Sequence, residues 1–200
     1  MIFRSIKELF LHPSNTGLYF LLLCLIILAL GAVSLKAHGT EPVAPSNVAQ
    51  AIRWWAREAP RNPVLRPEKL TPLSEAISKG AAKHGLPWEL VTAIVLRESS
   101  GHAEIAAEKN SRGGEIGVMQ VHPSNLKRFG CDVSTVAGQV DCGCKVLAHN
   151  YEQCGTLRGG LTRYASRYRK CRATPGSKLA WVVNDRFKLA KQLKKAGSPK

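Results

Sequence analysis

Residues 87–101 read PWELVTAIVLRESSG, and this stretch decides the expected fold. Its apolar side chains recur three and four positions apart, which is the spacing of one face of an α-helix. They are Leu90, Val91, Ile94 and Val95. Pro87 suits the first turn of a helix, and Gly101 suits the position just past its end. The stretch therefore predicts a helix with a buried stripe.

The segments around this helix also predict helices. Thr71 and Pro72 are typical of a helix start, and Leu73, Ile77 and Ala81 then share one face. Further helical patterns cover residues 124–129, 140–153 and 157–166. Because no run of residues alternates in the way of a strand, we predict an all-α domain over residues 71–172.

Glu98 is the residue that fits the structural pattern least. It lies three and four positions after Val95 and Ile94, so it shares their apolar face. Burial and the negative end of the helix dipole both disfavour a charged carboxylate, so we expect a raised pKa. A carboxyl that holds its proton near neutral pH is suited to general-acid catalysis. The structural alternative is a side chain that reaches solvent or pairs with Arg97 or another cation.

An apolar segment near the N-terminus predicts a membrane anchor. Residues 18–35, LYFLLLCLIILALGAVSL, carry no charge and would span about 27 Å as a helix, close to the thickness of a bilayer core. A cleaved signal peptide is the alternative, with Ala29-Leu30-Gly31 as a weak cleavage site. Basic residues on both sides give only a soft preference for a cytoplasmic N-terminus. We expect a single-pass inner-membrane protein with its domain in the periplasm.

The remaining segments complete the expected organisation. Residues 1–17 form a short cytoplasmic leader, and residues 36–70 form a proline-rich linker. Within that linker, NVAQAIRWWARE is a candidate short helix, whose Trp54 and Trp55 suit either a membrane interface or packing on the domain. Residues 173–200 predict a basic helix or tail that belongs to the domain as a solvated last helix, or touches anionic lipid or the cell wall.

The chain is strongly basic, with a formal net charge of +15. Nearly all of this excess lies beyond residue 40, and it favours an anionic partner. Nucleic acid, anionic lipid and the bacterial cell wall all meet that condition. The basic residues are scattered and no nucleic-acid recognition motif is present, so we expect no nucleic-acid partner.

Six cysteines indicate an oxidising compartment. Cys24 lies in the apolar segment, and the other five lie between residues 131 and 171 of the domain. Those five are Cys131, Cys142, Cys144, Cys154 and Cys171. The Cys142-Gly143-Cys144 spacing is too tight for a zinc knuckle and no histidine pair stands at ligand spacing, so the cysteines favour disulfides over a metal. We expect no metal and no cofactor.

Three motifs in order resemble the catalytic domain of soluble-type lytic transglycosylases, relatives of goose-type lysozyme. Glu98-Ser99 ends a helix, Gly117-Val118-Met119-Gln120 forms a loop, and Tyr164 lies on a later helix. The resemblance covers residues 73–166 and implies a lysozyme-like fold. Val118 replaces the usual leucine of this family, and Ala165 stands where asparagine is usual.

The resemblance also implies a reaction and roles. These enzymes cut the β-1,4 bond between N-acetylmuramic acid and N-acetylglucosamine in peptidoglycan strands and leave 1,6-anhydro ends, with one glutamate, here Glu98, as acid and then base. Ser99 would orient Glu98, and Gly117 would let the loop approach closely. Met119 and Gln120 would line the sugar cleft. The alternatives are that Met119 is a core residue and that Gln120 caps the following turn. Tyr164 would close over Glu98 unless it is a packing residue.

The cysteines fit this domain as braces. A Cys154–Cys171 bridge would clamp the helix pair that presents Tyr164, and Cys131 would pair with Cys142 or Cys144. Rival functions are a lysozyme-type hydrolase and a catalytically silent wall-binding scaffold. An envelope-spanning assembly is a candidate partner, and secretion, wall recycling and phage entry all suit the chain.

Overall fold

The computed structural model describes residues 41–58, 65–102, 114–166 and 170–198. The predicted leader, residues 1–17, and the predicted membrane anchor, residues 18–35, lie outside the described residues. Among the helices of the described ranges, none combines the length and the apolarity needed to cross a membrane.

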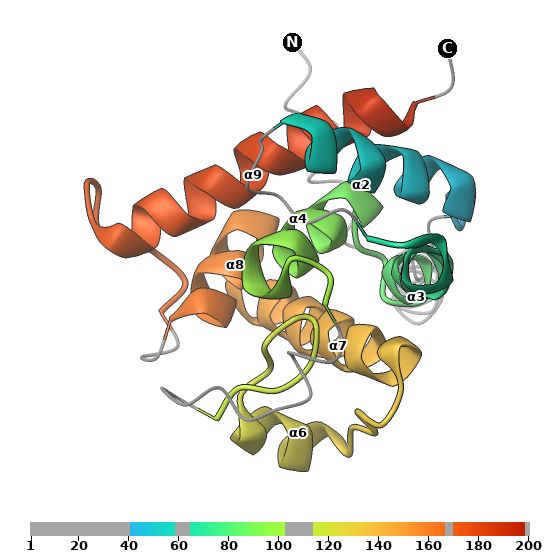
Figure 1. Ribbon diagram of the computed structural model, residues 1–200. Helices are drawn as coiled ribbons and strands as arrows, with labels where there is room; N and C mark the ends of the chain where they lie inside the picture. The colour runs from blue at the N-terminus through green and yellow to red at the C-terminus, as the bar shows by residue number, and fades with distance from the viewer. Residues whose placement is uncertain (1–40, 59–64, 103–113, 167–169, 199–200) are drawn as a thin grey trace, which may run out of the picture. The chain divides into compact units, whose positions relative to one another are not determined.

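The described residues are mostly helical (Figure 1). The helices are α2 (Pro45–Glu58), α3 (Pro67–Lys83), α4 (Trp88–Ser99), α6 (Pro123–Phe129), α7 (Val136–Cys154), α8 (Leu157–Ala165) and α9 (Lys178–Gly197). Within these ranges the β-type pairing is one isolated bridge, between Ile116 and Val121. The prediction of an all-α domain is confirmed.

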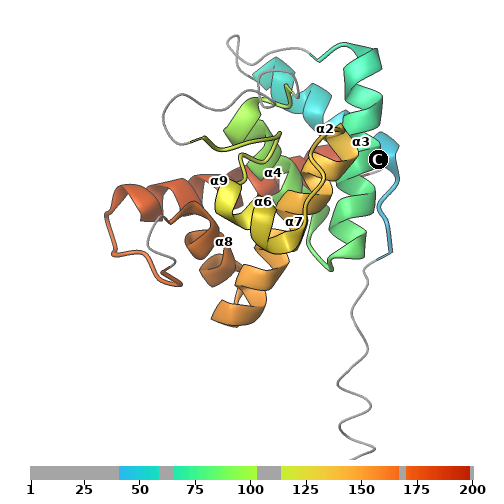
Figure 2. The same ribbon diagram turned by 90° about the horizontal axis from the view of Figure 1, so that it is seen from below.

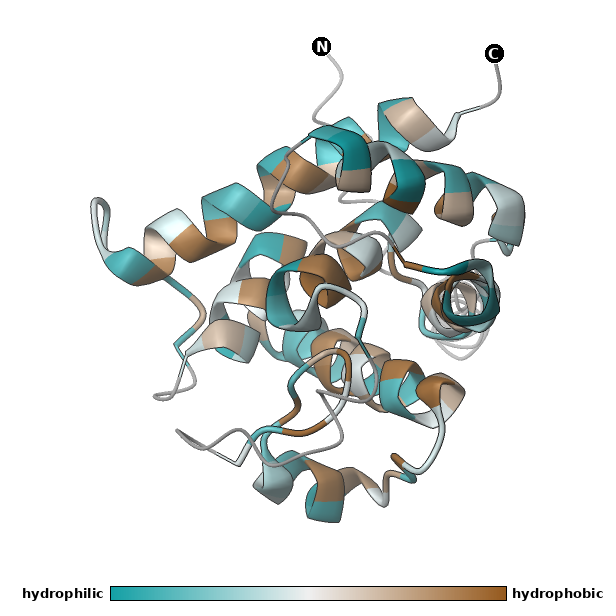
Figure 3. Ribbon diagram, in the orientation of Figure 1, coloured by the Kyte–Doolittle hydropathy of each residue, from teal (hydrophilic) through white to brown (hydrophobic). Residues whose placement is uncertain are grey.

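Helix α4 forms the centre of the domain. The predicted stripe is buried, and so is the rest of the helix, since every residue from Leu90 to Leu96 is at most 2% exposed. Helices α2, α3 and α9 all pack on α4, so it has no solvated face over these residues. The buried Thr92 hydroxyl donates to the Trp88 carbonyl at 2.8 Å, which satisfies its hydrogen bond inside the helix. Figure 3 shows the apolar positions of α4 within the helical assembly.

Helix α3 begins one turn earlier than predicted. Pro67 rather than Thr71 opens the helix, and Pro72 lies inside it. The buried face reaches back to Leu70, which is 2% exposed, so core packing extends the helix past the local start signal. Helix α7 lies beside α3 and pairs with α8 (Figures 1 and 2). Helix α7 also starts earlier than predicted, because the Thr135 hydroxyl accepts from Gly138 N–H and caps it.

Part of the segment predicted as an extended linker is helical. Helix α2 packs on α3 and α9, and Trp55 is only 5% exposed. Trp55 therefore takes the packing alternative, because its apolar ring gains more by burial in the core than in an extended tether. The predicted C-terminal helix is present as α9, and its buried Val183, Leu189 and Leu193 dock it on the domain.

Candidate active site

Glu98 lies in the last turn of α4, as the sequence predicted. Ser100 follows in a left-handed conformation (φ 55°) and ends the helix. The carboxyl group therefore lies at the negative end of the helix dipole, which disfavours its ionised form. Its side chain is 24% exposed, so the group is largely shielded and still reaches solvent.

The surroundings of Glu98 raise its pKa above the ordinary value. Burial has the largest influence and raises the pKa. The guanidinium of Arg186 lowers it, through charge and through a hydrogen bond, and the charge of Glu115 raises it again. The net shift of the pKa is upward, because the free-energy cost of removing the carboxylate from water exceeds the stabilisation by this single cation. The result is a carboxyl suited to hold a proton that it can donate.

Arg186 of α9 contacts Glu98 directly. Its Nη2 donates to Glu98 Oε1 at 2.5 Å, and its Nη1 donates to the Val182 carbonyl at 3.1 Å. The side chain is only 10% exposed. The pairing alternative considered for Glu98 is thus realised, although with Arg186 instead of Arg97, which pairs with Asp185.

Ser99 connects the end of α4 to the loop at residues 117–120. Its hydroxyl lies 3.1 Å from the Val95 carbonyl and 2.9 Å from the Val118 carbonyl, and it accepts from Gly101 N–H at 3.2 Å. These contacts hold the end of α4 against the loop at residues 117–120. The predicted help in orienting Glu98 would act through this connection.

The loop at residues 117–120 is tightly turned. Gly117 adopts φ +84°, and a Cβ there would come within 3.1 Å of the Gln139 side chain, so glycine is required both for its conformation and for its close approach. Gln139 Oε1 accepts from Val118 N–H at 3.0 Å. Gln120 Nε2 donates to the Gly117 carbonyl at 3.0 Å, which corresponds to the capping alternative for Gln120.

Met119 is fully buried, which favours its packing alternative over a position lining a sugar cleft. Its sulfur lies against Gly143 of α7, where any added Cβ would collide with it. The side chain therefore anchors the loop in the core, while its backbone carbonyl faces Tyr164. This contact explains why α7 needs glycine at position 143.

Tyr164 of α8 joins the loop to the site. Its hydroxyl donates to the Met119 carbonyl at 2.7 Å. Burial raises the pKa of Tyr164 well above its ordinary value, and the charge of Glu98 raises it further, so the phenol stays neutral. Ala165, the departure from the family pattern, ends α8 immediately after it.

The motif analysis missed Arg186, Gln139 and Gly143. For Arg186 a signal was present in the sequence. It occupies the apolar stripe of the last helix, between Val183 and Leu189, as Glu98 occupies the stripe of α4. When two buried stripes carry one residue each of opposite charge, these two residues are candidates to form an ion pair. Gln139 and Gly143 carried no comparable signal, because their importance depends on what the loop places against them.

Two disulfides brace the region around the site. Cys154–Cys171 links the end of α7 to the segment after α8, as predicted. Cys131 pairs with Cys142, which settles the alternative left open by the sequence. Cys144 is a buried free thiol, and burial raises its pKa strongly, so it stays protonated. Within the described ranges, no three His, Cys, Asp or Glu residues gather as metal ligands.

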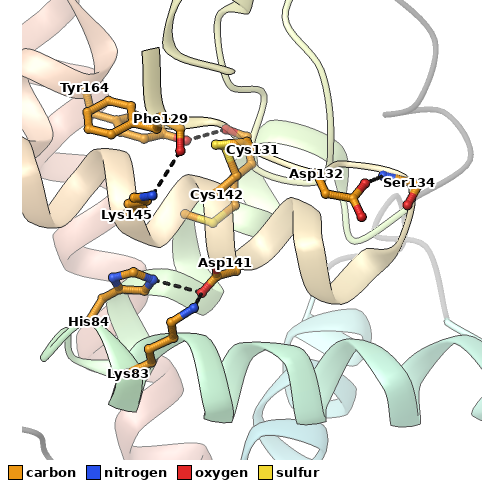
Figure 4. Close-up of a disulfide and its surroundings, with 11 residues drawn as sticks. Lys83, His84, Phe129, Cys131, Asp132, Ser134, Asp141, Cys142, Lys145 and Tyr164 are labelled. Atoms are coloured by element: carbon orange, nitrogen blue, oxygen red, sulfur yellow. Dashed lines mark hydrogen bonds and ion pairs between the residues drawn. A yellow bond between two sulfur atoms is a disulfide. The ribbon is translucent and has the colours of Figure 1, made fainter. Parts of the chain in front are cut away.

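A second charged cluster lies on the α3–α7 contact (Figure 4). Asp141 Oδ1 lies 2.8 Å from Lys83 Nζ and 2.9 Å from His84 Nε2. Asp141 immediately precedes Cys142, so the cluster and the Cys131–Cys142 disulfide brace the same turn of α7. Burial raises the pKa of Asp141, but the hydrogen bonds and charges of Lys83 and His84 together lower it below the ordinary value.

In the described part of the chain, an all-helical domain holds the shielded Glu98 in the last turn of α4, with a tyrosine and a tight loop beside it. Residues 75–173 match the transglycosylase SLT domain, and this part of the chain is such a domain, with the lysozyme-like helical fold. The family is one of peptidoglycan-degrading transglycosylases. Comparisons with curated proteins and with solved structures gave no match.

The family match includes most of α3 and all of α4, α6, α7 and α8. Helices α2 and α9 lie outside it, at residues 45–58 and 178–197. Arg186, the partner of Glu98, is therefore contributed by a part of the chain that the family match does not include.

Proposed function

We propose that this protein is a peptidoglycan lytic transglycosylase in which Glu98 is the single acid and base. The observation that carries the proposal is the partly shielded carboxyl at the end of α4, whose pKa is raised by burial. A reaction with one acid requires a group that gives up a proton and then accepts one. A carboxyl whose pKa is raised by its surroundings is suited to both requirements.

In the first step, Glu98 donates its proton to the glycosidic oxygen between N-acetylmuramic acid and N-acetylglucosamine. The bond from C1 of the muramic acid to that oxygen breaks, and the oxygen leaves as a hydroxyl. The acetamido oxygen of the same sugar stabilises the positive charge at C1, which is substrate assistance. Glu98 is then a carboxylate.

In the second step, the 6-hydroxyl of the muramic acid attacks C1 and forms the 1,6-anhydro ring. Glu98 accepts the proton of that hydroxyl and returns to its starting form, so no water is consumed. The neutral Tyr164 and the loop at residues 117–120 support the site, because Tyr164 holds the Met119 carbonyl and Ser99 holds the Val118 carbonyl. A rigid loop beside the acid favours a reproducible substrate position.

We also propose that residues 18–35 anchor the protein in the inner membrane, with the SLT domain in the periplasm. The charge-free length of that segment supports an anchor. The two disulfides support an oxidising compartment for the domain. A domain held beside the wall would act on the glycan strands nearest the membrane.

The test is mass spectrometry of the muropeptides released from purified peptidoglycan by the full-length chain. The Glu98→Gln variant and the matched Asp141→Asn variant are measured in parallel. Anhydromuramic products that vanish in Glu98→Gln and persist in Asp141→Asn would support the proposal. Reducing-end products would instead indicate a lysozyme-type hydrolase. Retained wall binding with no release by the wild-type chain would indicate a silent scaffold.

A further inference from the structure

The ion pair between Glu98 and Arg186 joins the family-matched domain to α9. The two residues are 88 positions apart in the sequence, and their side chains are 24% and 10% exposed. Arg186 is the more deeply buried of the two, so solvent does not compete strongly for its guanidinium. An ion pair this shielded is unlike the exposed pairs elsewhere on the molecule, such as Lys79 with Glu75.

Helix α9 has little freedom to carry Arg186 away from Glu98. Two further pairs join it to α4, from Lys194 to Glu89 at 3.5 Å and from Arg97 to Asp185 at 2.8 Å. The apolar residues of α9 on either side of Arg186 are buried in the core. The guanidinium is therefore held in place by the docking of the whole helix.

We propose that Arg186 is a positioning residue for Glu98, which holds Oε1 of the carboxyl and leaves Oε2 to exchange the proton with the substrate. This inference rests on the proposed function. The contact is end-on, through Nη2 alone. A protonated carboxyl still offers a carbonyl oxygen to such a donor, so the contact survives in both protonation states, whereas a two-pronged contact requires both oxygens.

The other contacts of Arg186 agree with this role. Nη1 is used by the Val182 carbonyl, and Nε is buried without a partner in the part of the chain that the structure describes. The guanidinium therefore hydrogen-bonds to Glu98 through Oε1 alone among the contacts of the described residues. For Glu98 Oε2, no hydrogen-bond partner is found among the described residues. The arrangement fixes the orientation of the carboxyl without occupying the oxygen that would carry the proton.

The electrostatics around Glu98 explain why a cation is useful there. The carboxylate formed after the first proton transfer is disfavoured by burial and by the charge of Glu115. Tyr164 from α8 is neutral and adds no compensating charge, and Arg97 is already paired with Asp185. Arg186 is thus the cation that stabilises the carboxylate until the proton returns. Without it, Glu98 would hold its proton to higher pH.

The experiment compares full-length Arg186→Met and Arg186→Lys with the wild type and with one control. The control, Lys188→Met, removes a charge from the exposed side of α9. We measure kcat/KM and kcat against pH on soluble peptidoglycan fragments, and the titration of Glu98 by NMR on glutamate labelled with 13C. The titration does not depend on activity, so it separates a failure of this inference from a failure of the proposed function.

In Arg186→Met we expect kcat at the optimum to fall by about tenfold or more. Cleavage begins from protonated Glu98, so kcat/KM declines as pH rises through the pKa of Glu98. Loss of the cation raises that pKa, so the alkaline limb and the NMR titration both move to higher pH. Arg186→Lys keeps the charge, so we expect a limb near that of the wild type with a reduced kcat. The control, Lys188→Met, should keep the wild-type limb and titration.

An unchanged titration of Glu98 in Arg186→Met would overturn the inference, even with reduced activity, because Arg186 would then only help to dock α9. Cleavage faster than that of the wild type would also overturn it, since Arg186 would be a restraint. Should Arg186→Met fail to fold, Arg186→Lys decides. A reduced kcat at an unchanged limb supports positioning, and a wild-type kcat overturns it.

Discussion

Glu98 and Asp141 are both carboxylates that pair with basic side chains, yet their pKa values move in opposite directions. Glu98 meets one buried arginine and lies at the negative end of a helix, and burial raises its pKa despite that partner. For Asp141, with a side chain that is 37% exposed, burial also acts upward, but Lys83 and His84 together outweigh it. The depth of the site and the number of basic partners decide the direction of the shift, and only the first arrangement raises the pKa of the carboxyl.

The two regions are also supported differently. Asp141 is braced within its own neighbourhood, by Lys83 and His84 at the end of α3 and by the disulfide at the adjacent Cys142. Glu98 depends on α9, which comes from the far end of the chain. A stabilising cluster can thus be built from nearby helices, whereas the shielded environment of Glu98 requires distant segments to close around it.

Neutralising each carboxylate in turn is the strongest test of this contrast. We expect Glu98→Gln to reduce the rate of peptidoglycan cleavage by about a thousandfold, because it removes the transferable proton and nearly preserves the shape of the side chain. Asp141→Asn should keep the wild-type rate. Turnover rates with purified sacculi, normalised to folded protein by circular dichroism, measure both. Equal losses in the two variants would remove the distinction.

Removing the disulfide beside Asp141 tests whether that region acts on stability alone. Replacing Cys131 and Cys142 together by alanine should lower the free energy of unfolding by about 3 kcal/mol in the chain-entropy model. The rate of cleavage per folded molecule should remain near that of the wild type. Urea unfolding followed by circular dichroism measures the first quantity. A large loss of rate in fully folded protein would show that the two regions are coupled.

Gly143→Ala sharpens the comparison, since α7 carries Asp141 and also supports the loop beside Glu98. The new methyl group would collide with the Met119 side chain, so we expect a loss of stability of about 1–3 kcal/mol. Because the Met119 carbonyl holds Tyr164, activity should fall as well. Gly130→Ala is a control, since a Cβ there meets nothing within 4 Å, although its φ of +59° carries a local strain of its own. Wild-type activity in Gly143→Ala would mean that the loop adapts.

The smallest effect concerns the pH dependence of stability at Asp141. Its folded-state pKa is lowered, so its stabilising contribution is present above the unfolded value of roughly 4 and is lost as pH falls through the folded value. Since Lys83 is largely exposed and Asp141 is more than a third exposed, we expect Asp141→Asn to cost less than about 1 kcal/mol at pH 7. Thermal unfolding from pH 7 to pH 2 should show the two proteins converging at acid pH. If the difference in stability between the two proteins stayed constant down to pH 2, it would not arise from the ionised Asp141 carboxylate.

Much of the fold could be predicted because helices are local. The stripe of α4, the short helix α6 and the cap before α8 all depend on residues within a few positions of one another. The predictions that differed were set by packing. Helix α3 starts early because Leu70 is buried, and the candidate helix of the linker, α2, packs on the domain and does not lie in an extended tether, because Trp55 is buried in the core.

For the site, the sequence by itself determined Glu98, since a glutamate on an apolar stripe at a helix end is visible in a few residues, and it determined the loop and Tyr164 through their resemblance to a known pattern. The tertiary structure alone decided the partner of Glu98, the pairing of Cys131 with Cys142 and the glycine that Met119 requires at position 143. The physical reason is range. Helix periodicity and capping act over about one turn, whereas an ion pair between residues 98 and 186 exists only after α4 and α9 have packed together.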